Sequence, residues 1–269
     1  MSEDQNRPEA GAGGPGLLAG KQCVVMGIQN RWSIAYAIAT AMAAAGARLA
    51  LTYVDDRAKR DADAFIGEHP GTLGYACNVE SDDDLDLFGA ALGRDLGRVD
   101  ALVHSIGYAP AAALQGRFVE TSRDDWRTTL SVSAYSLVAT AHRVAPLMSG
   151  GGSIMTLTYL GSDRVFPAYK VMGVAKAALE ASVRYLAADL GPERIRVNAI
   201  SAGPIKTAAA RGIPGFADMY AQMGERTPLK EPFGAAEVAP VAVFLAADLS
   251  RAITGEVIFV DNGYHAMGM

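Results

Sequence analysis

The chain alternates short runs of apolar residues with longer amphipathic segments that are rich in alanine. The apolar runs are typical of buried strands, and they predict strands over 22–26, 48–54, 72–77, 100–105, 153–158, 195–201 and 257–260. The amphipathic segments predict helices over 33–46, 56–68, 81–96, 124–148, 168–190 and 235–247. This alternation favours right-handed crossovers and a parallel sheet that is covered by helices on both faces.

We therefore expect one α/β domain over 17–269, built on a doubly wound, Rossmann-like, parallel seven-stranded sheet. Residues 1–16 are polar and rich in Gly and Pro, which predicts a disordered tail. The segment 203–234 breaks the rhythm, because it is long, rich in Gly and Pro, and follows a strand. Ligands bind beyond the carboxyl ends of such strands. We expect this segment to be a helical substrate lid with Phe216 in its apolar wall, and surface decoration is the alternative.

Composition excludes several classes of function. The chain has 269 residues, and 24 Lys+Arg against 29 Asp+Glu give a formal charge of −5, which offers no attraction to nucleic acid or an anionic membrane. No apolar run reaches the length of a membrane helix, and the first residues lack the features of a secretory signal. The two cysteines, Cys23 and Cys77, and the four scattered histidines have no metal-ligand spacing. These features predict a cytoplasmic, metal-free protein in which His104 has a structural role.

The first predicted strand leads directly into a glycine turn. Gly27 follows this strand, and Ser33 and Ile34 stand where the next helix begins. A glycine lets the chain turn sharply, and the free N–H groups at the start of a helix can bind a diphosphate. The usual GxGxxG is missing, so a plain strand–turn–helix junction is the alternative interpretation.

Two further strand ends support a nucleotide site. Asn78 and Val79 follow the third predicted strand, where a side chain can meet an adenine edge. Ser105, Ile106 and Gly107 follow the fourth, where a glycine lets the backbone approach a ribose. These residues could serve only as turns, but three strand ends of one sheet would open onto a single crevice.

The end of the second predicted strand bears on the choice of cofactor. Asp55 stands where an acidic residue can hold the 2′-hydroxyl of a ribose. After the second predicted strand, the first basic residue is Arg57. NADH is therefore expected rather than NADPH, although Arg57, Lys59 and Arg60 could still reach a 2′-phosphate.

Tyr169 and Lys176 are the candidate catalytic pair. They are seven residues apart, so on the predicted helix they share one face. A nearby lysine lowers the pKa of a phenol and can also hold a ribose. The phenol can then stabilise or protonate an oxyanion. The spacing alone also fits a core tyrosine and a surface lysine.

The stretch from Thr156 to Lys176 resembles the short-chain dehydrogenases/reductases and, more narrowly, the bacterial NADH-dependent enoyl-acyl-carrier-protein reductases of fatty acid synthesis. In the superfamily a serine lies seventeen residues before the lysine and a tyrosine four before it. This chain has Tyr159 and Met172 at those positions. In the enoyl reductase branch the tyrosine lies seven before the lysine, as Tyr169 does, and a second tyrosine matches Tyr159. The resemblance extends over 20–263.

The resemblance implies that NADH delivers a hydride to the β-carbon of a trans-2 enoyl chain, which an acyl carrier protein holds as a thioester. Tyr169 would donate a hydrogen bond to the thioester oxygen, Lys176 would hold the nicotinamide ribose, and Tyr159 would support the site. The further residues that it implies are Ile205 and Thr207 at the nicotinamide, Ser33 and Ile34 at the diphosphate, Val79 at the adenine, Ile106 and Gly107 near adenine and ribose, and Met172 and Phe216 at the substrate. Relatives are commonly homotetramers, and the helices 124–148 and 168–190 could pack across their two-fold axes.

One departure from the family leaves alternatives open. The lid of related reductases carries basic residues, whereas 212–225 contains no Lys or Arg and includes Asp218 and Glu225. Arg211, Arg226 and Lys230 flank it and could replace them. A reductase of another activated alkene or of a carbonyl is the second hypothesis. A catalytically silent NAD-binding regulator is the third, and the intact Tyr169–Lys176 pair weighs against it.

Overall fold

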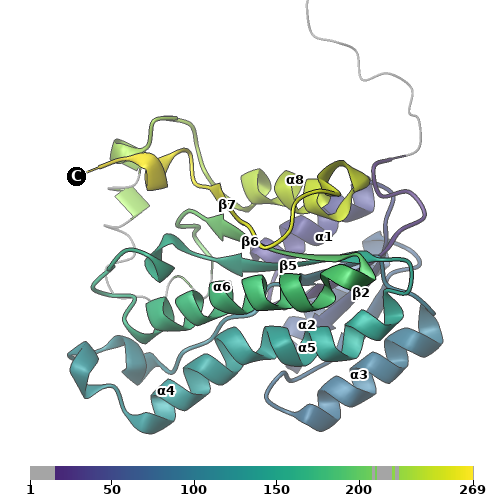
Figure 1. Ribbon diagram of the computed structural model, residues 1–269, viewed down its shortest axis with the longest axis horizontal. Coiled ribbons are helices and arrows are strands. Elements are labelled where there is room, and N and C mark those ends of the chain that lie inside the picture. The colour runs from purple at the N-terminus through teal and green to yellow at the C-terminus, as the bar shows by residue number, and fades with distance from the viewer. Residues whose placement is uncertain (1–15, 208–209, 211–219, 222–223, 269) are drawn as a thin grey trace, which may run out of the picture.

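The computed structural model describes residues 16–207, 210, 220–221 and 224–268. Its centre is a parallel seven-stranded sheet with the order β3-β2-β1-β4-β5-β6-β7 (Figure 1). The strands are β1 (Gln22–Met26), β2 (Arg48–Tyr53), β3 (Leu73–Ala76), β4 (Ala101–His104), β5 (Gly152–Thr158), β6 (Ile195–Ala202) and β7 (Val257–Val260). Each predicted strand is confirmed to within one residue at either end. The five inner strands are largely buried, as is typical of parallel strands that are continuous apolar runs.

The helices follow the predicted order. They are α1 (Ile34–Ala44), α2 (Asp56–Glu68), α3 (Asp82–Asp95), α4 (Arg123–Leu130), α5 (Ser136–Val144), α6 (Val171–Leu190) and α8 (Ala235–Ala246). Ser81 caps α3, since its hydroxyl accepts a hydrogen bond from the Asp84 N–H at 3.1 Å.

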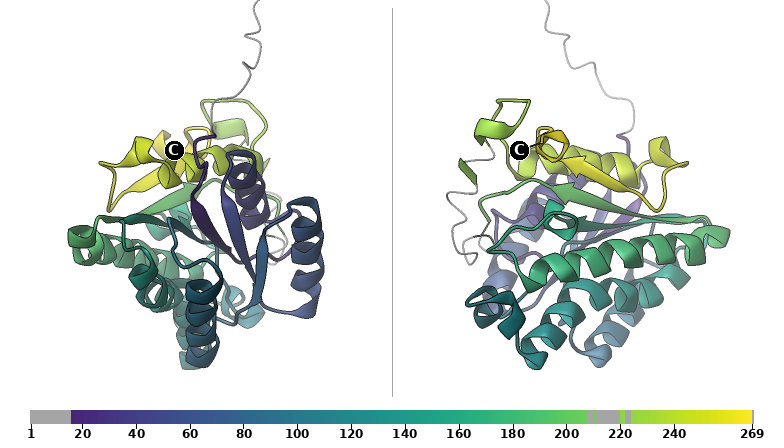
Figure 2. Two further views of the ribbon diagram at one scale, coloured as in Figure 1. Left: turned by 90° about the vertical axis from the view of Figure 1, so that its right-hand side faces the viewer. Right: turned by 60° about the vertical axis from the view of Figure 1, so that its left-hand side comes forward.

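The sheet lies between two layers of helices (Figure 2). One apolar core joins the sheet to α1, α2 and α8, and α1 and α8 lie side by side. The other core joins the opposite face of the sheet to α3, α5 and α6. The predicted doubly wound, Rossmann-like architecture is therefore confirmed.

The expectation that all crossovers have one hand is wrong for the last one. The connections β5–α6–β6 and β6–α8–β7 step in the same direction along the sheet. Their helices nevertheless cover opposite faces, so the two crossovers have opposite hands. The reversal places α8 beside α1 instead of beside α6. The long segment between β6 and α8 starts and ends near the edge of the sheet at which α1 begins, where the strands have their carboxyl ends.

The predicted helix 124–148 is interrupted. A π-helical turn, Ser131–Tyr135, separates α4 from α5, and a 3₁₀ turn, Ala145–Leu147, follows α5. Hydrophobic periodicity could not reveal this change, because a π turn inserts a single residue into an otherwise helical pattern.

Nearly all of the predicted tail and the middle part of the predicted lid lie outside the described residues, which begin at Gly16 and omit 208–209, 211–219 and 222–223. Phe216 is among the omitted positions. In the part of the chain that is described, no helix has the length and apolar character needed to cross a membrane.

Candidate active site

A cavity of about 780 Å³ opens where β1, β2, β4, β5 and β6 end at their carboxyl termini. Fourteen of the predicted site residues line it, and Phe216 lies outside the described residues. The fourteen are Gly27, Ser33, Ile34, Asn78, Val79, Ser105, Ile106, Gly107, Tyr159, Tyr169, Met172, Lys176, Ile205 and Thr207. The structure thus brings together residues that are up to 180 positions apart in the chain (Gly27 to Thr207).

Two independent features of the turn after β1 exclude a side chain at position 27. Gly27 has φ +88°, and a Cβ atom on it would lie 2.2 Å from the carbonyl oxygen of Ser105 at the end of β4. The Gly27 N–H donates to the Thr52 hydroxyl at 3.2 Å, and the Ile28 N–H donates to the Thr52 carbonyl at 3.0 Å. Thr52, which the sequence did not single out, therefore fixes this turn against β2.

Helix α1 starts directly after this turn, and its first residues lie in the cavity wall. Ser33 is the N-cap: its hydroxyl accepts from the Tyr36 N–H at 3.2 Å and donates to the Asn30 carbonyl at 2.8 Å. Ser33 and Ile34 both line the cavity. A close-approach glycine followed by a helix N-terminus fits the diphosphate of a dinucleotide.

The part of the cavity where we expect the adenosine contains Asn78, Val79, Tyr53 and Val54. Asp55, which was expected at the ribose 2′-hydroxyl, instead caps α2, because its carboxylate accepts a hydrogen bond from the Ala58 N–H at 2.7 Å. It is not among the residues that line the cavity. The sequence missed this role because an acidic residue after a strand fits a helix cap as well as a ribose.

Polar contacts behind β4 support the part of the cavity wall that follows this strand, where we expect a ribose. The Ser133 hydroxyl, in the π-helical turn, accepts from the Tyr108 N–H at 2.9 Å and donates to the Tyr108 carbonyl at 2.8 Å. His104 is fully buried, and its ring nitrogens lie 3.0 Å from the Thr156 hydroxyl and 2.8 Å from that of Ser136. Burial lowers the pKa of His104 to about 3, which confirms the structural role that we expected of it.

Tyr169 precedes the helix on which it was expected. Helix α6 begins at Val171, so the prediction that Tyr169 and Lys176 share a helix face is wrong. Lys170 has φ +43° and ψ −122°, and the Met172 N–H donates to the Tyr169 carbonyl at 3.0 Å. These are the features of a type II′ turn, which reorients the chain before the helix starts. The turn buries the Tyr169 side chain to 8% exposure in the cavity wall.

The two predicted tyrosines pack against each other. The rings of Tyr159 and Tyr169 meet edge to face with their centroids 5.0 Å apart, and Phe166 lies 5.0 Å from Tyr159 on another side. Leu114 and Met172 complete this apolar cluster. One end of the cavity is therefore aromatic and largely apolar, which suits a hydrocarbon chain.

The expectation that Lys176 lowers the pKa of Tyr169 is wrong. Burial, reinforced by the Glu180 carboxylate, raises the pKa of Tyr169 above its usual value. The Lys176 ammonium donates instead to the Leu157 carbonyl at 2.8 Å. The phenol is therefore protonated at neutral pH and is able to donate a hydrogen bond.

Lys176 itself is 6% exposed, and burial lowers its pKa to about 8. A Cβ atom on Gly107 would lie 3.4 Å from the Lys176 ammonium nitrogen and 3.7 Å from the Met172 methyl carbon. The glycine after β4 therefore keeps space open in front of the amine, where a ribose can approach.

Two further glycines set the position of Tyr169, and no pattern in the sequence distinguishes them. A Cβ atom on Gly161 would lie 2.5 Å from Tyr169 Cδ1 and 3.0 Å from Tyr159 Cδ1. A Cβ atom on Gly173 would lie 2.6 Å from the Gly161 carbonyl oxygen. The first turn of α6 can therefore approach the 3₁₀ turn Leu160–Ser162 closely enough to hold the phenol ring between them.

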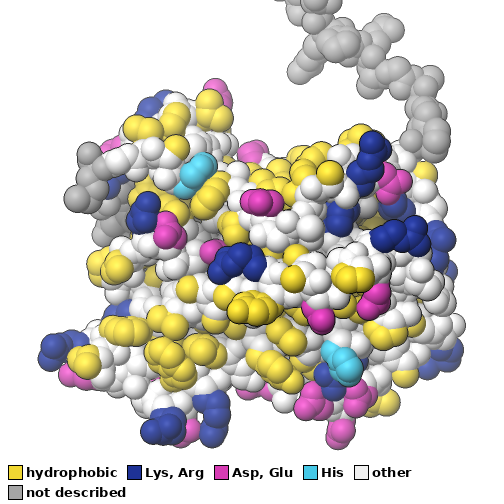
Figure 3. Space-filling view, viewed as in Figure 1, with side chains coloured by type: hydrophobic (Ala, Val, Ile, Leu, Met, Phe, Trp, Pro, Cys, Tyr) yellow, Lys and Arg dark blue, Asp and Glu magenta, His cyan; other side chains and the backbone are white. Residues whose placement is uncertain are grey.

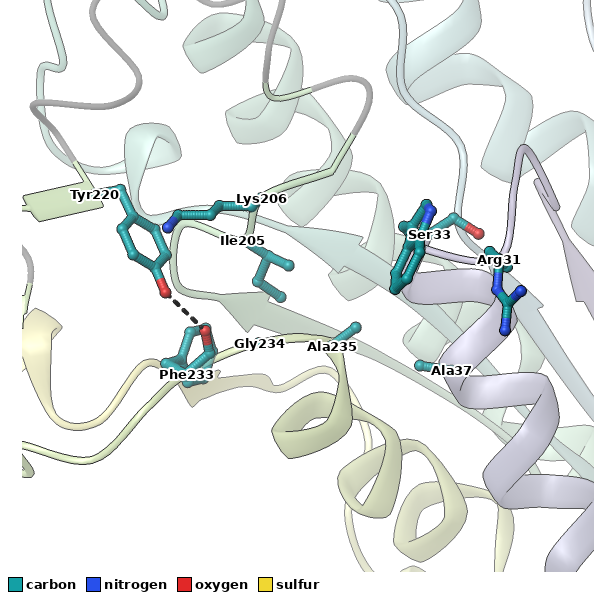
Figure 4. A pocket seen from close by; sticks show the side chains of 10 residues that line it. Arg31, Ser33, Ala37, Ile205, Lys206, Tyr220, Phe233, Gly234 and Ala235 are labelled. Atoms are coloured by element: carbon teal, nitrogen blue, oxygen red, sulfur yellow. Dashed lines mark hydrogen bonds between the residues drawn. The ribbon is translucent and has the colours of Figure 1, made fainter.

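A smaller pocket of about 270 Å³ lies beside the cavity and shares Ser33 and Ile205 with it (Figure 4). On one side, the Lys206 ammonium lies 4.3 Å from the centre of the Tyr220 ring. The Tyr220 hydroxyl donates to the Phe233 carbonyl at 3.3 Å. These contacts join the chain after β6 to the chain before α8.

The described residues contain no group of three or more His, Cys, Asp or Glu side chains that could hold a metal ion. The cavity brings a phenol and a buried amine together with a glycine turn and a helix N-terminus that fit a dinucleotide. A doubly wound sheet with this turn and this pair of side chains defines a dinucleotide-dependent oxidoreductase of the short-chain type.

Comparisons with known proteins define the family within that class. The family model described as "Enoyl-(Acyl carrier protein) reductase" matches residues 27–265, and the chain belongs to this family. It is 47% identical over 254 residues to "Enoyl-[acyl-carrier-protein] reductase [NADH] 1" of Rhizobium meliloti, covering 94% of this chain and 93% of that protein.

Another relative has a different cofactor in its name. The chain is 44% identical over 252 residues to "Enoyl-[acyl-carrier-protein] reductase [NADPH] FabI" of Staphylococcus aureus strain MRSA252, covering 93% of this chain and 98% of that protein. The crystal structure of the Bacillus cereus enoyl-acyl carrier protein reductase with NADP+ and indole naphthyridinone superposes with a TM-score of 0.92. It is 45% identical, and the match covers 94% of this chain and all of that one, 100%.

Proposed function

We propose that this reductase uses NADH to reduce the trans-2 double bond of enoyl thioesters carried on acyl carrier protein, with Tyr169 and Lys176 as its catalytic residues. The observation that carries the proposal is that the Gly27 turn and the start of α1 line the same cavity as Tyr169 and Lys176. A dinucleotide laid along it has its diphosphate at the helix N-terminus and its nicotinamide beside the phenol.

When bound, NADH supplies the hydride that adds to the β-carbon of the enoyl chain. Negative charge then develops on the thioester oxygen, and Tyr169 donates a hydrogen bond to it. Because burial keeps the phenol protonated, this donor is present throughout the neutral range. The α-carbon takes up a proton, and a saturated thioester results.

Lys176 contributes position and charge. Its ammonium group is anchored on the Leu157 carbonyl and faces the space that Gly107 leaves open, where it holds the hydroxyls of the nicotinamide ribose. Its positive charge also strengthens the field that stabilises the developing oxyanion. Ile205 and Thr207, at the end of β6, contact the nicotinamide from the other side of the cavity.

The remaining predicted residues divide between cofactor and substrate. Asn78, Val79, Ser105, Ile106 and Gly107 bind the adenosine half, and Gly27, Ser33 and Ile34 bind the diphosphate. Tyr159 and Met172 line the space for the acyl chain, since both lie in the apolar cluster around Tyr169. Phe216 is assigned to the same wall from the sequence.

The preference for NADH rests on the residues that follow β2. Tyr53 and Val54 line the adenosine end, and neither carries the positive charge that a 2′-phosphate needs. Among the basic residues nearby, Lys59 is paired with Asp63 at 2.6 Å. The acidic Asp55 and Asp56 at this end also repel a 2′-phosphate.

We also propose a homotetramer. Apolar side chains gather over α4, α5 and α6 (Figure 3). This region of the chain also carries three exposed aromatic residues, namely Trp126 in α4 (39% exposed), Tyr135 in the π-helical turn (56%) and Tyr185 in α6 (80%). Large exposed aromatic side chains on one face are typical of protein interfaces. A cytoplasmic location is proposed because Cys23 and Cys77 are unpaired, buried thiols, as is usual in a reducing compartment.

The test is to follow NADH absorbance with the purified protein and three substrates: crotonyl thioester, a longer 2-enoyl thioester and a ketone. We expect NADH to be oxidised in the presence of the thioesters, and we expect the reaction to be faster with NADH than with NADPH. Turnover of the ketone alone would assign the cavity to carbonyl reduction. NADH binding without any turnover would indicate a regulator instead of an enzyme.

A further inference from the structure

Two adjacent residues at the end of β5 each bond to α6. The Leu157 carbonyl accepts from the Lys176 ammonium at 2.8 Å, and the Thr158 hydroxyl donates to the Glu180 carboxylate at 2.6 Å. Lys176 and Glu180 are four residues apart on α6, so they lie on the same side of the helix. The end of β5 therefore holds α6 through one cation and one anion.

Glu180 acts electrostatically on both members of the catalytic pair. Its carboxylate raises the pKa of Lys176, opposing the larger effect of burial, and it also raises the pKa of Tyr169. Both effects favour the protonated form of the side chain. These are the forms that the proposed reduction needs, namely a charged ammonium and a neutral phenol.

Several charged groups on the neighbouring elements are engaged elsewhere. On the α4, α5 and β6 sides, Arg127 pairs with Asp124, Arg143 pairs with Asp82 and Asp86, and Arg196 bonds the carbonyls of Leu245 and Ile253. On the 3₁₀-turn side, Asp163 pairs with Arg164. On β4, His104 is neutral because burial holds its pKa near 3. Within the described chain, Glu180 is the carboxylate whose charge acts on the amine.

We propose that Glu180, held in place by Thr158, is a positioning residue of this reductase that supplies the counter-charge of the buried Lys176 ammonium. The proposal rests on the proposed function for the role of Lys176. Glu180 does not line the cavity, whereas Thr158 and Lys176 do, so it acts through them. Its loss leaves a buried cation without a partner charge, and such a cation releases its proton at lower pH.

The test compares Glu180→Gln with the wild type by measuring kcat/KM for a 2-enoyl thioester and Kd for NADH between pH 6 and pH 10. The amide still accepts the Thr158 hydrogen bond, so only the charge is removed. We expect the alkaline limb of both profiles to move to lower pH by about one unit. Asp189→Asn, an exposed change on the same helix, is the matched control and should leave both limbs in place.

Two further variants complete the design. Glu180→Asp retains the charge and should restore most of the alkaline limb, which loss of packing alone would not predict. Thr158→Val retains the charge of Glu180 but removes the hydrogen bond that holds its carboxylate. It should move the alkaline limb to lower pH by less than Glu180→Gln does. An alkaline limb of Glu180→Gln that coincides with the wild type would overturn the proposal. If Glu180→Gln does not fold, a wild-type limb for Thr158→Val overturns it.

The NADH titration separates this inference from the proposed function. It needs no substrate turnover, so it reports the charge of Lys176 even if the protein reduces no enoyl thioester. A shifted NADH limb without thioester reduction would support Glu180 and contradict the proposed substrate.

Discussion

The two ends of the cavity are built in different ways. The nucleotide end uses regular structure: strands β1 and β4 end side by side, and Gly27 turns into α1 against the Ser105 carbonyl. The reaction end uses irregular backbone: a 3₁₀ turn at Leu160–Ser162 and a type II′ turn at Lys170 precede α6. Regular strand ends can hold a ligand that is common to many enzymes, whereas the irregular turns place one phenol for one reaction.

This difference predicts how each end responds to mutation. A change at the nucleotide end disturbs the packing between strands, and so it should affect folding and NADH binding together. A change at the reaction end moves Tyr169 by a small distance, and it should lower kcat while NADH binding remains. Three pairs of variants examine this contrast.

Gly27→Ala should have the largest effect. The new methyl group meets the Ser105 carbonyl at 2.2 Å, and the residue must keep φ +88°. We expect a combined loss of about 2–5 kcal/mol in folding and NADH-binding free energy, from strain and overpacking. Gly20→Ala is the control, because Gly20 has φ +77° with open space around it and should cost only about 1–2 kcal/mol in stability.

Urea unfolding and titration of NADH fluorescence measure these losses. Equal losses for the two glycine variants would mean that the close approach to Ser105 is unimportant. The proposed diphosphate site at the Gly27 turn would then need another explanation.

Gly161→Ala should have the next largest effect, and it should fall on kcat. A Cβ atom here would lie 2.5 Å from the Tyr169 ring, which must move away. Since a misplacement of about 1 Å can cost on the order of 10²-fold in rate, we expect kcat to fall by about that factor. The NADH Kd should change little.

Gly150→Ala, with nothing within 4 Å of the new methyl group, is the matched control for steady-state kinetics. A Gly161→Ala enzyme with wild-type kcat would show that the ring position tolerates displacement. The contrast between the two ends of the cavity would then be weaker than the structure indicates.

Lys170 should give the smallest effect. Its φ of +43° is unusual for a side-chain-bearing residue, and its ammonium donates to the Gly116 carbonyl. Lys170→Val should lower the free energy of unfolding by about 1–3 kcal/mol, because a β-branched residue resists this conformation. Lys170→Gly keeps the turn and should stay within about 1 kcal/mol of the wild type.

Thermal or urea unfolding of the two Lys170 variants, together with kcat, measures the difference. Valine should also lower kcat more than glycine does, since it disfavours the turn that places Tyr169. If both variants lose the same stability, the ammonium contact is more important than the turn.

The sequence was sufficient to predict the sheet, the order of the elements and the cavity. Buried parallel strands are continuous apolar runs, and polar or glycine residues just beyond them mark the ligand side. Gly27, Asn78 and Gly107 were found in this way, and all three line the cavity. The position of Tyr169 relative to Lys176 came from a family resemblance, and the helical spacing first used for it was wrong.

Three features of the site could not be predicted for physical reasons. The II′ turn at Lys170 uses a residue that does not favour positive φ, so composition gives no signal. The direction of the Tyr169 pKa shift depends on burial and on where the Lys176 ammonium points, which spacing does not specify. The opposite hand of the β6–α8–β7 crossover contradicts a strong general rule, and it became evident only when α8 was seen beside α1.

The central claim is that the Tyr169 phenol assists hydride transfer at the far end of a dinucleotide cavity. The most direct measurement is kcat for a 2-enoyl thioester in Tyr169→Phe, with Kd for NADH measured in parallel and Tyr159→Phe as the comparison. Loss of one positioned donor predicts a decrease of about 10²–10⁴-fold in kcat, an unchanged Kd, and a smaller decrease for Tyr159→Phe. Wild-type turnover by Tyr169→Phe would contradict the account.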